Sequence, residues 1–80
     1  MTGEEFQSKM RLAEALADSG KPPEYYAGYM LGLRRHYHGE AFGTEEEHEK
    51  WLQLIGDEDE ARREMGRGYV DGSAGLDPEA

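Results

Sequence analysis

Signals that start α-helices recur along this sequence of 80 residues, and they constrain its fold more than any other feature. Three pairs have the spacing of a capping box, in which one side chain accepts from the third helical amide and a carboxylate reaches back to the cap. These pairs are Thr2 with Glu5, Thr44 with Glu47, and Asp57 with Glu60. Pro22 and Pro23 mark a further start, because proline at the first helical position loses no hydrogen bond.

Glycines supply the matching stop signals. They are Gly20, Gly39, Gly56 and Gly72. The starts and stops together predict a compact all-α bundle of four short helices, with no sheet, in a single domain over residues 1–72. Residues 73–80 contain Gly75 and Pro78 and show no periodicity, which predicts a frayed, flexible C-terminal tail.

Packing must stabilise this bundle without help from disulfides, because the chain has no cysteine. Apolar residues at helical spacing predict the core. The predicted core residues are Phe6, Met10, Tyr29, Leu33, Trp51, Leu52 and Ile55. Gly28 and Gly32 share one face of the second helix, where we expect a neighbouring helix to approach closely.

One internal echo is visible in the sequence. Residues 24–32, EYYAGYMLG, match residues 64–72, EMGRGYVDG, at Glu, Gly, Tyr and Gly. Each copy follows a capped helix, so one interpretation is a pair of related helical hairpins packed together. The other interpretation is that a match of this length arose by chance.

The net charge is −9, and a field of this sign repels nucleic acid and anionic membranes while attracting basic surfaces. Residues 44–72 contribute −6 of this charge. Acids at helix starts complement the helix dipole, so a solvated face is one explanation. The other is a partner-binding surface, since the acids exceed what the dipole needs. The candidate residues are Glu45, Glu46, Glu47, Glu49, Asp57, Glu58, Asp59, Glu60 and Glu64.

Residue patterns for catalysis, metal binding and phosphate binding are missing from the sequence. His36, His38 and His48 with Glu40 lack metal-ligand spacing, so we expect no metal or other cofactor. No serine has a nucleophile context, which predicts that the chain is not an enzyme. The cations at Arg34 and Arg35 fit the last turn of a helix, where the dipole favours them, better than a phosphate site.

The absence of a long apolar run or a signal sequence predicts a cytoplasmic protein that does not enter a membrane. Small size, marked acidity, absence of cysteine and the helical pattern are similar to those of phage- or mobile-element-encoded anti-CRISPR proteins of the DNA-mimic kind. Residues 25–44, YYAGYMLGLRRHYHGEAFGT, also resemble small proteins of such elements.

This resemblance implies a monomer in the cytoplasm of a bacterial host that binds a type I CRISPR surveillance complex (Cascade) and blocks its DNA-binding surface. It carries over no individual residue, so the candidate surface rests on charge. The alternative function is a small adaptor or antitoxin-like module that contacts its partner through the tyrosine-rich second helix.

Overall fold

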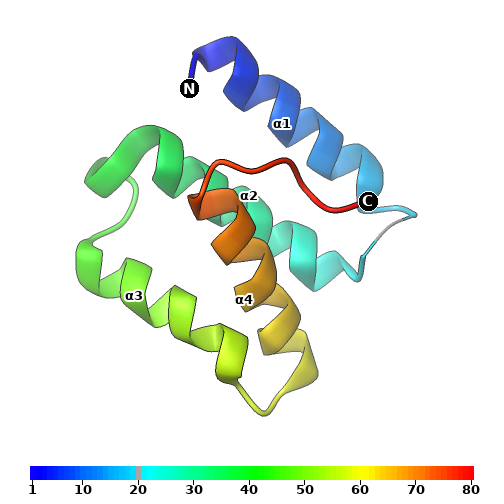
Figure 1. Cartoon of the computed structure of the whole chain (residues 1–80), viewed down its shortest axis with the longest axis vertical. Helices are drawn as coiled ribbons and strands as arrows, with labels where there is room; N and C mark the ends of the chain where they lie inside the picture. Colours follow the sequence, from blue (N-terminus) through cyan, green and yellow to red (C-terminus); the bar gives the residue numbers. More distant parts are fainter. Residues whose placement is uncertain (20) are drawn as a thin grey trace.

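The computed structural model describes residues 1–19 and 21–80, which form four α-helices and two single-turn 3-10 helices (Figure 1). The elements are α1 (Gly3–Leu16), α2 (Pro23–His38), η1 (Gly39–Ala41), α3 (Glu45–Gln53), η2 (Leu54–Gly56) and α4 (Glu60–Ser73). No strand occurs in these two ranges, so the prediction of an all-α fold is confirmed. The predicted stop at Gly20 lies outside the described residues. None of the described helices is long and apolar enough to cross a membrane.

Local capping explains where the helices begin. The capping boxes of Thr2 and Thr44 are both formed, and Pro23 is the first residue of α2, as predicted. The predicted start of the fourth helix was wrong by two residues. Its cap is Asp59, whose Oδ2 accepts from the amide of Arg62 at 2.9 Å, whereas the Asp57 carboxylate accepts from the amide of Asp59 and shapes the preceding turn.

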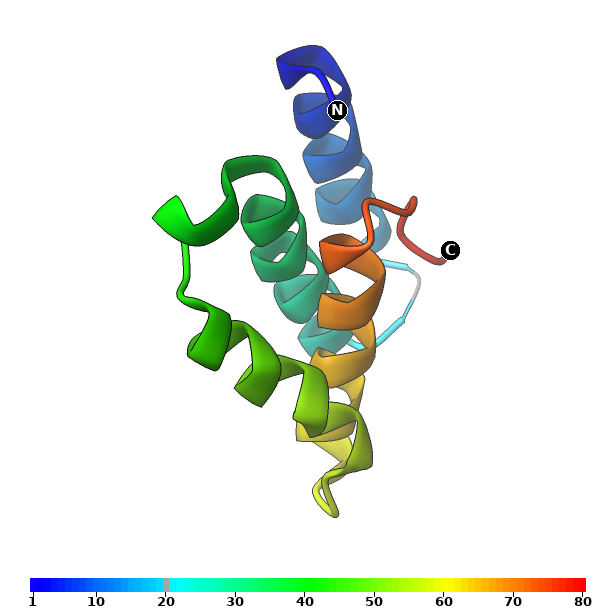
Figure 2. The same cartoon turned by 60° about the vertical axis from the view of Figure 1, so that its left-hand side comes forward.

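The helices form two hairpins, α1 with α2 and α3 with α4, which meet along α2 and α4. Figures 1 and 2 both show this central pair with α1 and α3 on opposite outer sides. The Cα atoms span 36 × 32 × 14 Å, so the molecule is a thin plate. The predicted arrangement of two packed hairpins is therefore confirmed.

Backbone contact between α2 and α4 replaces the usual layer of interlocking side chains. At four glycines, an added Cβ would lie only 1.8–2.3 Å from a carbonyl oxygen of the facing helix. The glycine and carbonyl pairs are Gly28 with Met65, Gly32 with Tyr69, Gly68 with Tyr25, and Gly72 with Tyr29. These four glycines are named the glycine seam below. The close approach predicted for Gly28 and Gly32 is thus confirmed.

The glycine seam also relates the two copies of the echo. The glycine contacts advance along both helices in the same direction, so α2 and α4 run parallel. Gly28 and Gly68 occupy equivalent places, because each faces a carbonyl three residues before the other glycine. The same holds for Gly32 and Gly72. The matched positions of the echo therefore make equivalent contacts across an approximate two-fold axis.

Tyrosine dominates the core that surrounds the glycine seam. The buried apolar residues are Ala13, Tyr25, Tyr26, Tyr29, Leu33 and Tyr69. The prediction was right for Tyr29 and Leu33 and partly right for Phe6 and Met10, which are partly buried and pack against the core. It was wrong for Trp51 and Leu52, which are half-buried outside the core cluster, and for Ile55, which is 51% exposed.

The position of α3 explains this difference. Because α2 and α4 touch through their backbones, α3 packs on the outside of the pair, mainly against α4. Trp51 stacks on Tyr69 with ring centroids 5.5 Å apart, and this stack attaches α3 to the central pair.

The end of the chain is packed on the core, and the prediction of a frayed tail was wrong for it. After α4, Gly75 takes a φ of 74°, and residues 76–80 fold back across α2 as the C-terminal strap. Pro78 is buried, and the hydroxyls of Tyr25, Tyr26 and Tyr29 all hydrogen-bond to the strap backbone. Such side-chain contacts can hold a segment that has no periodic pattern.

The glycine seam generates a prediction about stability. Gly68→Ala places a methyl group against the Tyr25 carbonyl of α2, and overpacking of this kind should cost about 3 kcal/mol. Gly56→Ala is the matched control, because nothing lies within 4 Å of its Cβ position. Thermal unfolding followed by circular dichroism should show a much lower Tm for Gly68→Ala alone. Equal Tm values would contradict backbone contact between α2 and α4.

Buried tyrosines generate a second prediction, on alkaline pH. Burial and the nearby Asp77 and Asp71 charges raise the pKa of Tyr29 from 10.0 to about 12. A raised folded-state pKa contributes stability that is full below pH 10 and is lost as the pH rises toward 12. We expect the free energy of unfolding to fall across this interval. Tyr29→Phe should be less stable at neutral pH but lose less of its stability there; an identical pH profile would contradict the assignment.

Candidate partner-binding surface

Eight of the nine candidate acids lie toward the two ends of α3, and Glu64 lies one turn into α4. Glu45, Glu46 and Glu47 form the first turn of α3, and Glu49 follows on the next turn. Residues 57–60 lie beyond the other end of α3, in the turn that leads into α4. A helix rises about 1.5 Å per residue, so the nine residues of α3 place about 13 Å between its two ends. The structure therefore spreads these acids along one hairpin and does not gather them at a single point.

Three of the acids hold the hairpin together. Glu47 closes the Thr44 capping box, with its amide 3.2 Å from the Thr44 hydroxyl. Asp59 caps α4, and Asp57 accepts from the Asp59 amide at 2.8 Å. Arg63 adds two hydrogen bonds from its guanidinium to the carbonyls of residues 57 and 58. These acids have local structural roles.

Two further acids are engaged in ion pairs. Glu45 accepts from Arg35 at 3.1 Å, and this contact joins the start of α3 to the last turn of α2. The Arg35 side chain is only 13% exposed, so its charge is largely withdrawn from solvent. Glu64 lies 3.9 Å from Arg67, and its Oε2 is buried without a hydrogen-bond partner. Glu45 and Glu64 therefore neutralise charges of the chain itself.

The remaining predicted acids are Glu46, Glu49, Glu58 and Glu60, and all of them are exposed. Glu46 makes only a loose pair with Lys50, at 3.9 Å and with both side chains over 70% exposed. Within residues 1–19 and 21–80, the carboxylates of Glu49, Glu58 and Glu60 form neither an ion pair nor a hydrogen bond. Their charges are available to a partner.

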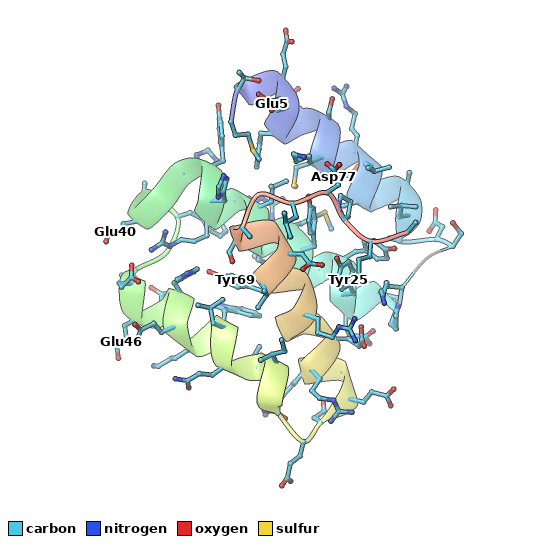
Figure 3. The ribbon with its side chains drawn as sticks, viewed as in Figure 1. Glu5, Tyr25, Glu40, Glu46, Tyr69 and Asp77 are labelled. Atoms are coloured by element: carbon cyan, nitrogen blue, oxygen red, sulfur yellow. The ribbon has the colours of Figure 1, made fainter. Side chains whose placement is uncertain are left out.

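Glu40 belongs with these acids, although the sequence analysis did not include it. It lies in η1 and is exposed, and Figure 3 shows Glu40 and Glu46 pointing outward on the same side of the molecule. Gly39, the predicted helix stop, was the only signal that this acid leaves the second helix. We name Glu40, Glu46, Glu49 and Glu58 the acidic edge; they are exposed and come from η1, α3 and the turn before α4.

Glu60 faces a different part of the structure. With Glu24 and Glu64 it lines a hollow of about 190 Å³ between the starts of α2 and α4, where Pro22 and Ala61 complete the wall. Glu24 and Glu64 are matched positions of the echo, which explains why they approach the same place from two helices. The predicted set of nine acids is therefore divided between two surfaces.

The histidines lie at helix ends and against aromatic rings. Nδ1 of His36 is 3.0 Å from the carbonyl of Ser73, and Nδ1 of His48 is 2.8 Å from the Tyr69 hydroxyl. His38 packs edge-on to Phe6. Among the residues that the structure describes, no group of three histidines or acids is arranged to hold a metal ion.

No protein-family model, curated protein or solved structure significantly matches the chain. Fold and surface together define a small all-α protein that presents an unneutralised acidic edge.

The division of the acids generates a prediction about stability. Asp59→Ala removes the α4 cap and should cost about 1 kcal/mol, while Glu49→Ala on the acidic edge should change stability by less than about 0.5 kcal/mol. Urea unfolding of both variants measures this difference. A larger loss for Glu49→Ala would show that the acidic edge has a structural role.

Proposed function

We propose that this protein is an inhibitor whose acidic edge occupies a cationic nucleic-acid-binding groove of another protein. The observation that carries the proposal is that Glu40, Glu46, Glu49 and Glu58 remain exposed and are not consumed by helix caps or close ion pairs. Helix caps and the ion pair with Arg35 engage Glu45, Glu47, Asp57 and Asp59, whereas the four acids of the acidic edge stay exposed to solvent. Several like charges on one surface repel one another, and a basic partner lowers this unfavourable electrostatic energy.

The geometry of the acidic edge supports the proposal that it takes the place of nucleic acid in the partner's groove. Side chains on neighbouring helical turns lie about 5–6 Å apart, as at Glu46 and Glu49. Duplex DNA carries one phosphate per about 3.4 Å of axis on each strand, so the length of α3, about 13 Å, corresponds to roughly four of these steps. The caps and the Arg35 pair with Glu45 hold α3 in place, which reduces the ordering cost of binding.

The target follows from the class resemblance of the sequence. Small acidic anti-CRISPR proteins of the DNA-mimic kind bind surveillance complexes, and we propose a type I complex (Cascade) as the partner. The chain would act by occupying the complex's target-DNA groove as a monomer. This is a binding function and requires no catalytic residue or cofactor.

The alternative function, an adaptor that docks through its tyrosine-rich second helix, has less support. Tyr25, Tyr26 and Tyr29 are 0–1% exposed with the C-terminal strap in place, so they do not form a free docking face. Tyr37 is 38% exposed and is stacked on Phe6 of α1. Contact through α2 would therefore depend on a single tyrosine.

A charge-reversal experiment tests the proposed function. The triple variant Glu46→Lys, Glu49→Lys, Glu58→Lys should inhibit target-DNA binding by a purified type I surveillance complex at least tenfold more weakly. The measurement is a mobility shift of labelled target duplex at low and high salt. Inhibition by the unmodified chain should weaken as salt rises, because the Debye length falls from about 10 Å at 0.1 M to about 3 Å at 1 M.

A matched control separates the position of the charges from their number. The triple variant Glu4→Lys, Glu14→Lys, Asp18→Lys makes the same change in net charge at exposed positions of the first hairpin. We expect it to inhibit like the unmodified chain. If both variants lose inhibition equally, net charge and not the acidic edge is responsible; if neither does, the proposal is wrong.

A further inference from the structure

The C-terminal strap is held through its main chain by a row of tyrosines on α2. The Tyr29 hydroxyl donates to the Leu76 carbonyl at 2.6 Å, and the Tyr26 hydroxyl donates to the Glu79 carbonyl at 2.8 Å. The amide of Glu79 donates to the Tyr25 hydroxyl at 3.1 Å. Both backbone groups of Glu79 are therefore bound by two adjacent tyrosines, in the way that a peptide-binding groove holds an extended ligand.

Contacts outside the strap fix the hydrogen-bonding polarity of these hydroxyls. Tyr25 must donate its proton to the Asp71 carboxylate of α4, at 2.5 Å, which leaves its oxygen free to accept an amide. The hydroxyl of Tyr26 accepts from the amide of Lys21 at 2.9 Å, which leaves its proton free for a carbonyl. These contacts assign an accepting hydroxyl oxygen to Tyr25 and a donating hydroxyl to Tyr26, which is the polarity that the strap backbone uses.

Basic residues from three parts of the chain surround the same segment. Lys9 of α1 pairs with Asp77. Lys21, which precedes α2, lies 2.9 Å from the Glu79 carboxylate, and Arg67 of α4 lies 3.7 Å from it. Figure 3 shows Asp77 on the strap beside α1. A chain of net charge −9 has only nine basic residues, and three of them meet here. The rim of the groove is complementary to an acidic peptide.

The strap itself has few apolar contacts. Leu76 is 55% exposed, and Asp77 and Glu79 are also exposed, so Pro78 is its one buried residue. Gly75, with its positive φ, joins the strap to α4 and can turn without strain. The glycine seam contacts all lie before the strap, so release of the strap would break none of them.

We propose that the groove formed by Tyr25, Tyr26 and Tyr29 with Lys9, Lys21 and Arg67 is a recognition site for an extended acidic segment of a partner protein. The strap, Leu-Asp-Pro-Glu-Ala, is its resident ligand and shows the chemistry that the groove selects. That chemistry is two acids separated by proline, in an extended segment whose backbone groups hydrogen-bond to the tyrosines. A partner segment of this kind displaces the strap. This site is separate from the acidic edge and does not depend on the function proposed for it.

The experiment uses the full chain and the free peptide Leu-Asp-Pro-Glu-Ala. In the variant Asp77→Lys, Glu79→Lys, the strap is repelled by Lys9, Lys21 and Arg67, so the groove should be open. Peptide titration followed by NMR of backbone amides should show binding at least tenfold tighter than to the unmodified chain, with shifts at α2. The control peptide Leu-Lys-Pro-Lys-Ala should not bind, and adding Lys21→Glu to the variant should weaken binding of the acidic peptide.

Three results would overturn the proposal. The first is a folded variant, with a helical circular dichroism spectrum, that binds neither peptide. The second is loss of the helical spectrum in the variant, which would make the strap an indispensable part of the fold and not a ligand. The third is a concentration-dependent dimer of the unmodified chain that the acidic peptide dissociates, which would assign the groove to the strap of a second copy.

Discussion

Backbone contact between α2 and α4 determines where every other element of this protein lies. Four glycines allow carbonyl groups of one helix to rest against the Cα atoms of the other, a distance that any side chain would prevent. Such contacts combine close-packed dispersion with weak Cα–H···O interactions. With no side-chain layer between the two helices, the tyrosines are displaced to the flanks of the pair. There they form the core and bind the strap, while α1 and α3 cover the outside.

Local chemistry made the helices predictable, but not the packing between them. The Thr2 and Thr44 boxes are complete within four residues, so the sequence alone predicts them. Asp57 and Asp59 are both suitable caps, and the turn that Asp57 forms decides between them. Apolar spacing predicted Trp51 in the core, but Trp51 is half-buried and Tyr25, beside the glycine seam, is fully buried. The strap contacts tyrosines 47 to 54 residues away, and no local pattern records contacts of that range.

The candidate surface could be predicted as a region but not as a set of residues. Counting charges located the excess in the second hairpin, and all four unengaged acids of the predicted set come from it. Which acids are structural and which are exposed is decided by the hydrogen bonds and ion pairs that each carboxylate makes with an amide or a guanidinium. Glu45 and Glu46 are neighbours in sequence, yet Arg35 neutralises only Glu45, because α2 ends beside one face of α3. Glu40 was missed since it joins the edge only through the fold.

The thinness of the plate has a consequence for how the protein opens. With 14 Å across its shortest dimension and helices about 10–12 Å wide, the zone shielded from water is small; it surrounds the α2 and α4 pair and includes Ala13 of α1. Amide exchange should therefore follow a steep gradient, slowest at the centre of α2 and α4 and faster in α1 and α3. The outer helices share fewer contacts with the central pair than α2 and α4 share with each other, so we expect opening of an outer helix to cost less free energy than separation of the central pair.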